Sequence, residues 1–195
     1  KNEQNQCQMH PSYFYYFWHG ILFALMIKNI LMKTKFTFLF CLFAGILFAQ
    51  ETQKQLPSVV LKDLSGSSVN TAEMGFEGPV VISFWATWCS PCKKELNTIH
   101  DLYPDWQDET GVTLVAVSVD DEKTKRQVAV YSNGKAWDYE ILLDPNGDFK
   151  RAMGVNNVPH TFLIDTDGNI VYSHNNYAPG DEEELYEEIL KLGSK

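Results

Sequence analysis

A pair of cysteines two residues apart constrains this chain most, because it stands where a strand pattern changes to a helix pattern. The run VVISFW from Val80 is rich in β-branched and aromatic residues, which favour a buried strand. After the segment Trp88-Cys89-Ser90-Pro91-Cys92, good helix formers follow from Lys93. Pro91 suits the first turn of a helix, where its missing N–H would have no intrahelical partner. We therefore expect a strand that leads into a helix beginning around the cysteines.

The position of the two cysteines predicts redox chemistry. Unpaired N–H groups and the macrodipole at a helix N-terminus favour a thiolate over a thiol. The spacing lets Cys92 reach back to Cys89 and close a disulfide, a redox-active pair that needs no further cofactor. Cys89 precedes the helix, so we expect it to be exposed and to attack. Cys92 lies one turn inside, so it should be shielded and should resolve the mixed disulfide.

Two other interpretations of the cysteine pair are weaker. A zinc site commonly uses a second cysteine pair or a paired histidine motif. From residue 50 onward the chain has no third cysteine and only the widely spaced His100, His160 and His174, so we expect no metal site. A purely structural disulfide across two residues would close almost no loop and would therefore add little stability.

The residues around the cysteines also carry a resemblance. The segment FWATWCSPC, followed by Val158-Pro159 and an expected strand from Thr161, resembles the thioredoxin superfamily. Over residues 56–195 the chain is most similar to the TlpA/ResA-like extracytoplasmic thiol-disulfide oxidoreductases. The resemblance implies a cis peptide bond before Pro159, with Val158 and Pro159 lying against the cysteines. It also implies that Trp88 and Pro91 support the active site.

The same resemblance implies an α/β fold of the thioredoxin type. Its central mixed sheet would be flanked by helices, with an N-terminal strand extension and the insertion found in the TlpA/ResA group. The residue pattern predicts strands at 56–61, 69–70, 112–119, 139–143, 161–165 and 170–174, and further helices at 121–133, 149–153 and 181–192. A strand, a helix and a second strand in succession imply a right-handed crossover.

Glu95 is a candidate functional carboxylate in this helix, because it follows Cys92 by three residues and lies on the same face of the helix. Thioredoxins themselves carry a buried aspartate six residues before the first cysteine, where this chain has Ser83. In the ResA-like subgroup a glutamate beside the second cysteine serves its proton transfer, so the resemblance implies that role for Glu95. The residues alone leave open a solvated Lys93–Glu95 surface.

His160, next to the proline, also has two interpretations. It either touches the thiols or packs beside them without chemistry.

The first 49 residues carry a targeting pattern. Residues 32–49 resemble a signal peptide or membrane anchor, with Lys33 and Lys35, an apolar core at 36–48 and a cleavage junction at Ala49-Gln50. Residues 1–31 form an upstream segment that is either read-through, a fragment or a different start. We expect export to an extracytoplasmic compartment such as the periplasm, with membrane attachment only if this segment is retained. Residues 50–195 then form one thioredoxin-like domain.

The charge balance narrows the partners. The chain carries 25 Asp and Glu against 16 Lys and Arg, a formal net charge of −9, which argues against nucleic acid and anionic membrane surfaces. The resemblance instead implies exported protein thiols and disulfides as substrates, with apocytochrome c as one candidate. A membrane thiol-disulfide protein would then donate the electrons.

Three function classes remain. The first is an exported dithiol oxidoreductase, working as a reductant, because strongly oxidising relatives place a histidine where this chain has Ser90-Pro91. The second is a thioredoxin-fold peroxidase, which needs a proline and a threonine where this chain has Ile82 and Ala86. The third is a non-catalytic thiol chaperone or copper carrier. Copper carriers of this fold separate their cysteines by three residues, whereas the spacing here is two.

Overall fold

The computed structural model describes residues 54–74 and 77–193. The expected upstream segment and the signal at residues 32–49 lie outside the described residues. The described elements, in chain order, are β1 (Val60–Asp63), β2 (Ser68–Asn70), the 3-10 turn η1 (Thr71–Glu73), β3 (Val80–Trp85), α2 (Ser90–Thr110), β4 (Thr113–Ser118), α3 (Arg126–Gly134), β5 (Glu140–Leu143), α4 (Asp148–Met153), β6 (His160–Ile164), β7 (Ile170–Asn175) and α5 (Asp181–Gly193).

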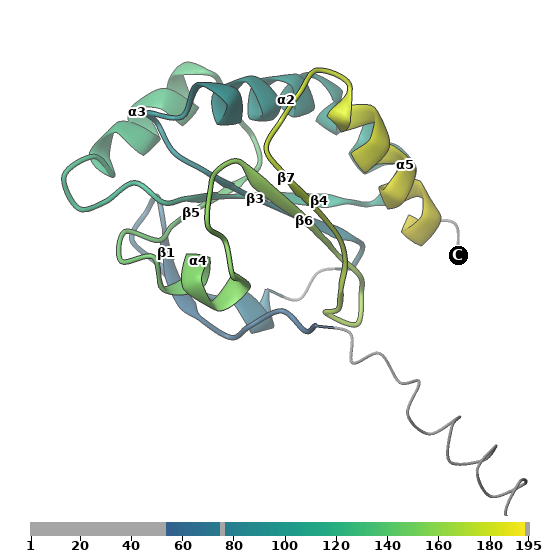
Figure 1. The fold of residues 1–195 in the computed structure, drawn as a ribbon, viewed down its shortest axis with the longest axis horizontal. Helices are drawn as coiled ribbons and strands as arrows, with labels where there is room; N and C mark the ends of the chain where they lie inside the picture. Colours follow the sequence, from purple (N-terminus) through teal and green to yellow (C-terminus); the bar gives the residue numbers. More distant parts are fainter. Residues whose placement is uncertain (1–53, 75–76, 194–195) are drawn as a thin grey trace, which may run out of the picture. The chain divides into compact units, whose positions relative to one another are not determined.

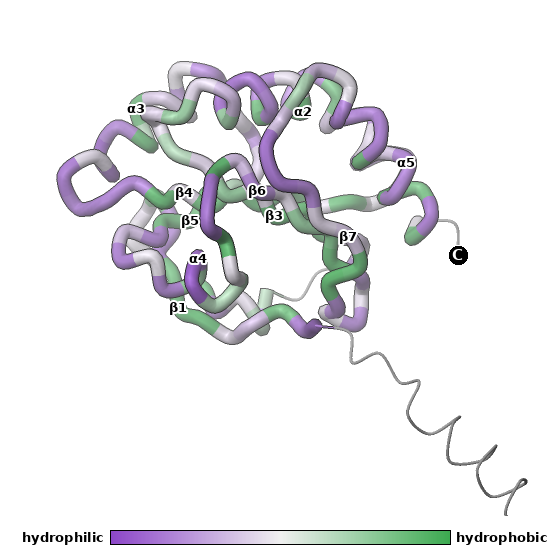
Figure 2. Tube along the Cα trace, in the orientation of Figure 1, coloured by the Kyte–Doolittle hydropathy of each residue, from purple (hydrophilic) through white to green (hydrophobic). Residues whose placement is uncertain are grey.

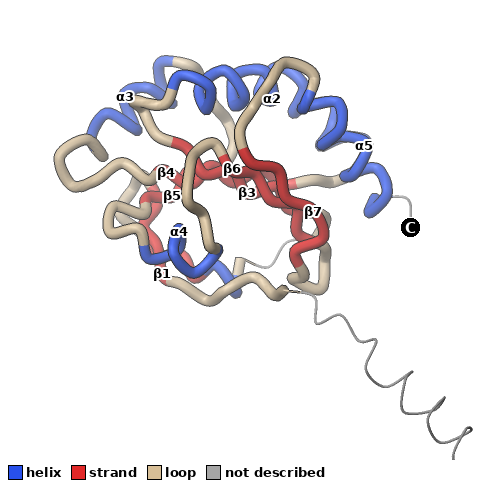
Figure 3. Tube along the Cα trace, in the orientation of Figure 1, coloured by secondary structure: helices blue, strands red, loops and turns tan. Residues whose placement is uncertain are grey.

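The strands form one mixed sheet in the order β2-β1-β5-β4-β3-β6-β7. The central strands β3, β4 and β5 are parallel, whereas β6 and β7 continue the sheet on one side and β1 and β2 on the other with antiparallel pairing. Helices α2, α3 and α5 lie over one face and α4 over the other (Figures 1 and 3). The expected mixed sheet flanked by helices is therefore confirmed.

Alternate residues of the central strands supply two separate cores, because successive side chains of a strand point to opposite faces. Val81 and Trp85 of β3 pack with Leu96 and Ile99 of α2. Ile82 and Phe84 face the opposite way and pack with Phe149 and Met153 of α4. All six residues of β3 are buried, and β3 pairs with β4 on one side and with β6 on the other. The hydropathy colouring shows apolar residues along the central strands (Figure 2).

The two elements expected from the resemblance are both present. The N-terminal extension is the hairpin β1–β2, which pairs with β5 at the edge of the sheet. The insertion is the strand β5 and the helix α4, which stand in the sequence between β4 and the segment that carries Pro159.

Two expected elements begin four or five residues later than the sequence pattern indicates. The opening strand starts at Val60 and not at Leu56, because Pro57 has no N–H for a ladder, and the Leu56 N–H donates to the Gly168 carbonyl oxygen at 2.9 Å instead. The helix expected from Asp121 starts at Arg126. The Asp121 carboxylate accepts from the backbone N–H groups of Lys123 and Thr124 at 3.0 Å, and this local turn competes with helix formation.

Within residues 54–74 and 77–193, no helix combines the length and apolar character that crossing a membrane requires.

The entry into β3 depends on a close approach between two backbone segments. A Cβ added at Gly78 would lie 2.5 Å from the carbonyl oxygen of Gly111, the residue that ends α2. We predict that Gly78→Ala destabilises the protein by roughly 1–3 kcal/mol, because neither backbone can move without disturbing β3 or β4. Chemical denaturation of the oxidised protein measures this.

Gly134→Ala is the matched control. An added Cβ at Gly134 meets nothing within 4 Å, so alanine should stabilise the last turn of α3 by up to about 1 kcal/mol. Equal effects of the two substitutions would show that the contact between Gly78 and Gly111 does not constrain the fold.

Candidate active site

The two cysteines lie at the junction between β3 and α2. The chain leaves β3 after Trp85, and the Cys89 N–H donates to the Ala86 carbonyl oxygen at 3.0 Å. Cys89 has an extended backbone and is the N-cap residue of α2, with Pro91 in the first turn. The expected helix start at the cysteines is confirmed, so both sulfurs lie at the end of α2 that favours negative charge.

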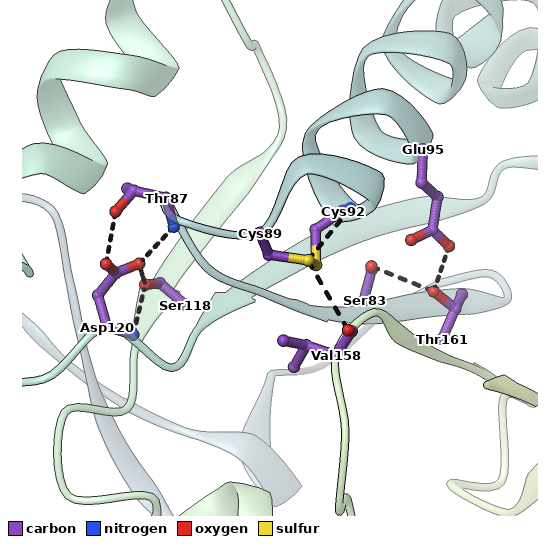
Figure 4. Close-up of a disulfide and its surroundings, with 9 residues drawn as sticks. All are labelled: Ser83, Thr87, Cys89, Cys92, Glu95, Ser118, Asp120, Val158 and Thr161. Carbon is purple, nitrogen blue, oxygen red and sulfur yellow. Dashed lines mark hydrogen bonds between the residues drawn. A yellow bond between two sulfur atoms is a disulfide. The ribbon is translucent and has the colours of Figure 1, made fainter. Parts of the chain in front are cut away.

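Cys89 and Cys92 form a disulfide, with their Cα atoms 5.4 Å apart (Figure 4). The backbone N–H of Cys92 donates to Cys89 Sγ at 3.3 Å. This is one of the N–H groups at the start of a helix that have no carbonyl partner in the preceding turn. When the disulfide is reduced, the same N–H group can stabilise a thiolate at Cys89.

Cys89 was expected to be exposed, and the structure shows that it is mostly buried. Cys89 is 5% exposed and Cys92 is fully buried, so only the order of the two agrees with the expectation. Cys89 is covered because the Val158 carbonyl oxygen lies 3.7 Å from its Sγ. The neighbouring side chain of Trp88 is 64% exposed, so it presents a large apolar surface to solvent beside the disulfide.

The segment that covers Cys89 contains the expected cis peptide bond, between Val158 and Pro159. Pro159 is buried, and its carbonyl oxygen accepts from the Asn176 N–H at 2.9 Å, which fixes this segment to the end of β7. The contact between Cys89 Sγ and the Val158 oxygen becomes a hydrogen bond only when the sulfur carries a proton, since a disulfide sulfur has none to donate.

Asp120 is a residue of the site that the sequence analysis missed. It is buried after β4, and its carboxylate accepts from the Thr87 N–H at 2.8 Å, the Thr87 hydroxyl at 2.6 Å and the Ser118 hydroxyl at 2.9 Å (Figure 4). These bonds hold the loop that precedes Cys89. The only sequence signal was an acidic residue directly after a buried strand, the edge where the loops of parallel strands meet.

Glu95 is 4% exposed, so the interpretation of Lys93–Glu95 as a solvated surface is wrong for this residue. Its Oε1 accepts a 2.6 Å hydrogen bond from the Thr161 hydroxyl, whose oxygen also lies 3.1 Å from Ser83 Oγ. Figure 4 shows Cys92 and Glu95 one turn apart on α2, with Ser83 and Thr161 on neighbouring strands beneath them. The carboxyl group is thus enclosed between α2 and the sheet.

Burial raises the pKa of Glu95 from its ordinary 4.5 to about 7. The hydroxyls of Thr161 and Ser83 oppose this shift, whereas the negative charges of Asp181 and Glu182 add to it. A carboxyl group with this pKa is protonated in about half of the molecules at neutral pH, so it can both accept and release a proton under working conditions.

The hydroxyl chain beside Glu95 can follow its protonation. Thr161 has a single hydroxyl hydrogen, which it donates to Glu95 when the carboxylate is ionised. When Glu95 is protonated it can itself donate to Thr161, which frees the threonine hydrogen for Ser83. Both states of the carboxyl group therefore keep this oxygen hydrogen-bonded.

His160 packs against an aromatic ring. It stacks on Phe162 with the ring centroids 4.3 Å apart, and its burial lowers its pKa. This arrangement favours the packing interpretation of His160 over contact with the thiols. Across the described residues, no group of three or more His, Cys, Asp or Glu side chains is placed to hold a metal ion.

Glu95→Gln should change the pH dependence of stability. Wild-type stability should fall as pH rises from 4.5 through about 7, because the folded protein retains the Glu95 proton that the unfolded chain releases. Glutamine does not titrate, so the variant should gain up to roughly 3 kcal/mol over the wild type across this window, with the difference flattening above pH 7. Urea unfolding of both oxidised proteins between pH 4 and 8.5 measures it.

Glu187→Gln, which removes a carboxyl group from the exposed part of α5, controls for the loss of one charge. A stability difference between Glu95→Gln and wild type that stays constant across the pH range would contradict the burial of a titrating carboxyl group.

Comparison with known proteins identifies the family of the chain. A model of the AhpC/TSA family matches residues 52–173. The thiol-disulfide oxidoreductase ResA of Bacillus thuringiensis subsp. konkukian is 32% identical over 137 residues, covering 68% of this chain and 76% of the relative.

Solved structures show the same fold. The solution structure of a thioredoxin-like protein from Porphyromonas gingivalis has 46% identity and a TM-score of 0.64, covering 74% of this chain and 95% of that one. The crystal structure of a thio-disulfide isomerase from Thermus thermophilus has 29% identity and a TM-score of 0.58, covering 72% and 96%. The chain therefore belongs to the AhpC/TSA family of thioredoxin-like proteins, among the relatives of the ResA thiol-disulfide oxidoreductases.

Proposed function

We propose that this chain is an exported thiol-disulfide oxidoreductase that reduces disulfides of extracytoplasmic proteins. The observation that carries the proposal is the Cys89–Cys92 disulfide at the N-terminus of α2, backed by the buried carboxyl group of Glu95. The similarity to ResA supports the reaction type, and the targeting pattern at residues 32–49 supports export. Cys89, Cys92 and Glu95 are the proposed catalytic residues.

The reaction begins at Cys89. In the reduced protein its thiolate attacks one sulfur of a substrate disulfide, forms a mixed disulfide and expels the other substrate sulfur as a thiolate. The small exposed fraction of the pair belongs to Cys89, which supports this order. Trp88 offers an exposed apolar surface beside the sulfur, and the Val158 carbonyl oxygen lies against the sulfur itself.

Cys92 completes the exchange. Its thiol gives up a proton, its sulfur attacks Cys89 Sγ, and the second substrate sulfur leaves as a thiolate. The protein is thereby oxidised to the disulfide and the substrate is reduced to two thiols. A buried thiol needs a nearby acceptor for its proton, and Glu95, one turn further along α2, has a pKa of about 7 that suits the task.

Sequence and family support a proposal for the direction of the reaction and for its partners. The dipeptide Ser90-Pro91 lacks the histidine of strongly oxidising relatives, which supports a reducing role. A membrane thiol-disulfide protein would then return the electrons to the Cys89–Cys92 disulfide. Thiols of apocytochrome c, kept reduced for haem attachment, are one candidate for the substrate.

The other two function classes have less support. Ile82 and Ala86 occupy the positions where a thioredoxin-fold peroxidase needs a proline and a threonine, and both are fully buried apolar side chains. The disulfide closes over two intervening residues, whereas a copper carrier of this fold uses three. Hydrogen-peroxide consumption and copper titration of the reduced protein separate these classes from a disulfide reductase.

We predict that Cys89→Ser reduces insulin disulfides no faster than the uncatalysed background, because it removes the attacking sulfur. Cys92→Ser should instead accumulate mixed disulfides with substrate proteins, since the resolving sulfur is missing. Turbidity of precipitating insulin measures the first, and non-reducing gels measure the second. The trapped species should disappear on addition of dithiothreitol.

Trapping by Cys89→Ser and not by Cys92→Ser would reverse the assigned order of attack. Identification of the proteins trapped by Cys92→Ser in the extracytoplasmic fraction would name the physiological substrate.

A further inference from the structure

A small cavity adjoins Glu95. Its walls come from α2, β6, β7, α5 and the segment between β7 and α5, and they include Glu95, Thr161, His174, Tyr177 and Asp181. The space open to the centre of a water molecule is about 10 Å³. That is close to the minimum a single buried water requires, so the cavity fits one water and little more.

The inner end of this cavity is next to a buried carboxyl oxygen that lacks a hydrogen bond among the described residues. Glu95 Oε1 is held by Thr161, but Glu95 Oε2 is buried and has no hydrogen-bond partner within the described parts of the chain. A buried carboxyl oxygen without a partner is costly, and polar cavities beside such groups are where ordered water is found. A water in the cavity would supply the missing bond to Oε2.

The outer end of the cavity is formed by a histidine and an aspartate that both reach solvent. His174 Nε2 lies 3.1 Å from Asp181 Oδ2, and the two side chains are 32% and 27% exposed. The negative charge of Asp181 helps raise the pKa of Glu95, which shows that the inner carboxyl group and the outer pair interact. An imidazole can accept a proton at one ring nitrogen and release one from the other, so the pair is able to pass a proton on to solvent.

The other titratable groups around the cavity are less suited to carry a proton. Tyr172 of β7 and Tyr177 both have a pKa raised first of all by burial, so both stay neutral at working pH. The Tyr177 hydroxyl is already engaged, since it donates to Glu182 Oε2 at 2.9 Å. His160 of β6 has a pKa that is lowered first by burial and then by His174. Tyr139 has a pKa that is raised first by burial, and the charge of Glu95 adds to this rise.

We propose that Glu95 exchanges its proton with solvent through this cavity, by way of one water and the His174–Asp181 pair. This inference rests on the proposed role of Glu95 in the reaction of Cys92 and extends it. After Glu95 has taken the proton of Cys92, Oε2 passes a proton to the water. The water passes one of its own to the His174–Asp181 pair, which releases it to solvent. The path runs in reverse when the disulfide is reduced, and it moves no electrons.

The test is His174→Gln in the full chain, which keeps a polar side chain at a partly exposed position. The measured step is closure of the Cys89–Cys92 disulfide from a mixed disulfide with an aromatic thiol, followed by stopped flow at neutral pH and low buffer concentration. We expect closure to slow by roughly tenfold, less than the loss of a general base, because bulk water still reaches the mouth of the cavity. Added imidazole should restore the rate, since it replaces the missing proton carrier.

His100→Gln is the matched control. His100 also faces an aspartate, with Nδ1 3.5 Å from Asp138 Oδ1, and it has a similar exposure, but it does not line the cavity. This variant should close its disulfide at the wild-type rate, without any effect of imidazole.

A wild-type rate in His174→Gln would overturn the relay, and so would a slow rate that imidazole does not restore, since that points to a structural effect. Glu95→Gln separates the two proposals. If Glu95→Gln is slow and His174→Gln is normal, the relay alone fails. If Glu95→Gln closes its disulfide at the wild-type rate, the role of Glu95 fails and the relay fails with it.

Discussion

The register between β3 and β6 is the constraint on which the site depends. It places Ser83 opposite Thr161 and Phe84 opposite His160. Pro159 therefore stands level with Trp85, the last residue of β3, from which the chain continues toward Cys89, and Thr161 comes beneath Glu95. A slip of one residue would move every side chain of β6 to the other face of the sheet. The cover over the disulfide and the hydrogen bond to Glu95 would be lost together.

The same arrangement gives the chain a residue that lowers its stability. A carboxyl group enclosed between α2 and the sheet resists ionisation, and the acidic start of α5 increases that resistance. An uncharged side chain of the same shape would fit this position at a lower cost in free energy. Proteins retain such groups mainly at functional sites, where a shifted pKa is useful. The environment of Glu95 thus agrees with a function in proton transfer better than with a function in packing.

The parts of the fold that depend on local patterns could be predicted from the sequence. The buried strand before the cysteines, the helix start at Cys89 and the strands that follow Pro159 all arise from neighbouring residues, and the structure confirms them. The start of α3 was missed because the side chain of Asp121 forms a turn with its own neighbours. Helix periodicity does not register that competition.

The details of the site that depend on distant contacts could not be predicted in the same way. Cys89 is covered by Val158, 69 positions later in the chain, so its low exposure follows from the packing of a loop and not from its place before a helix. The burial of Glu95 depends on Thr161 and on the acidic start of α5, which helix geometry alone does not include. Asp120 was overlooked for the same reason, since its partner Thr87 lies on another loop.

The central claim is that Glu95 and Cys92 share a proton. The most direct measurement is the thiolate absorbance of Cys92 against pH in Cys89→Ser, with and without Glu95→Gln. With Cys7→Ser and Cys41→Ser added to this background, Cys92 is the one cysteine left in the sequence, so the titration reports its ionisation alone. The account predicts that Cys92 ionises at a lower pH when Glu95 is replaced by glutamine, because a nearby carboxylate opposes a second negative charge. Superimposable titration curves would contradict it.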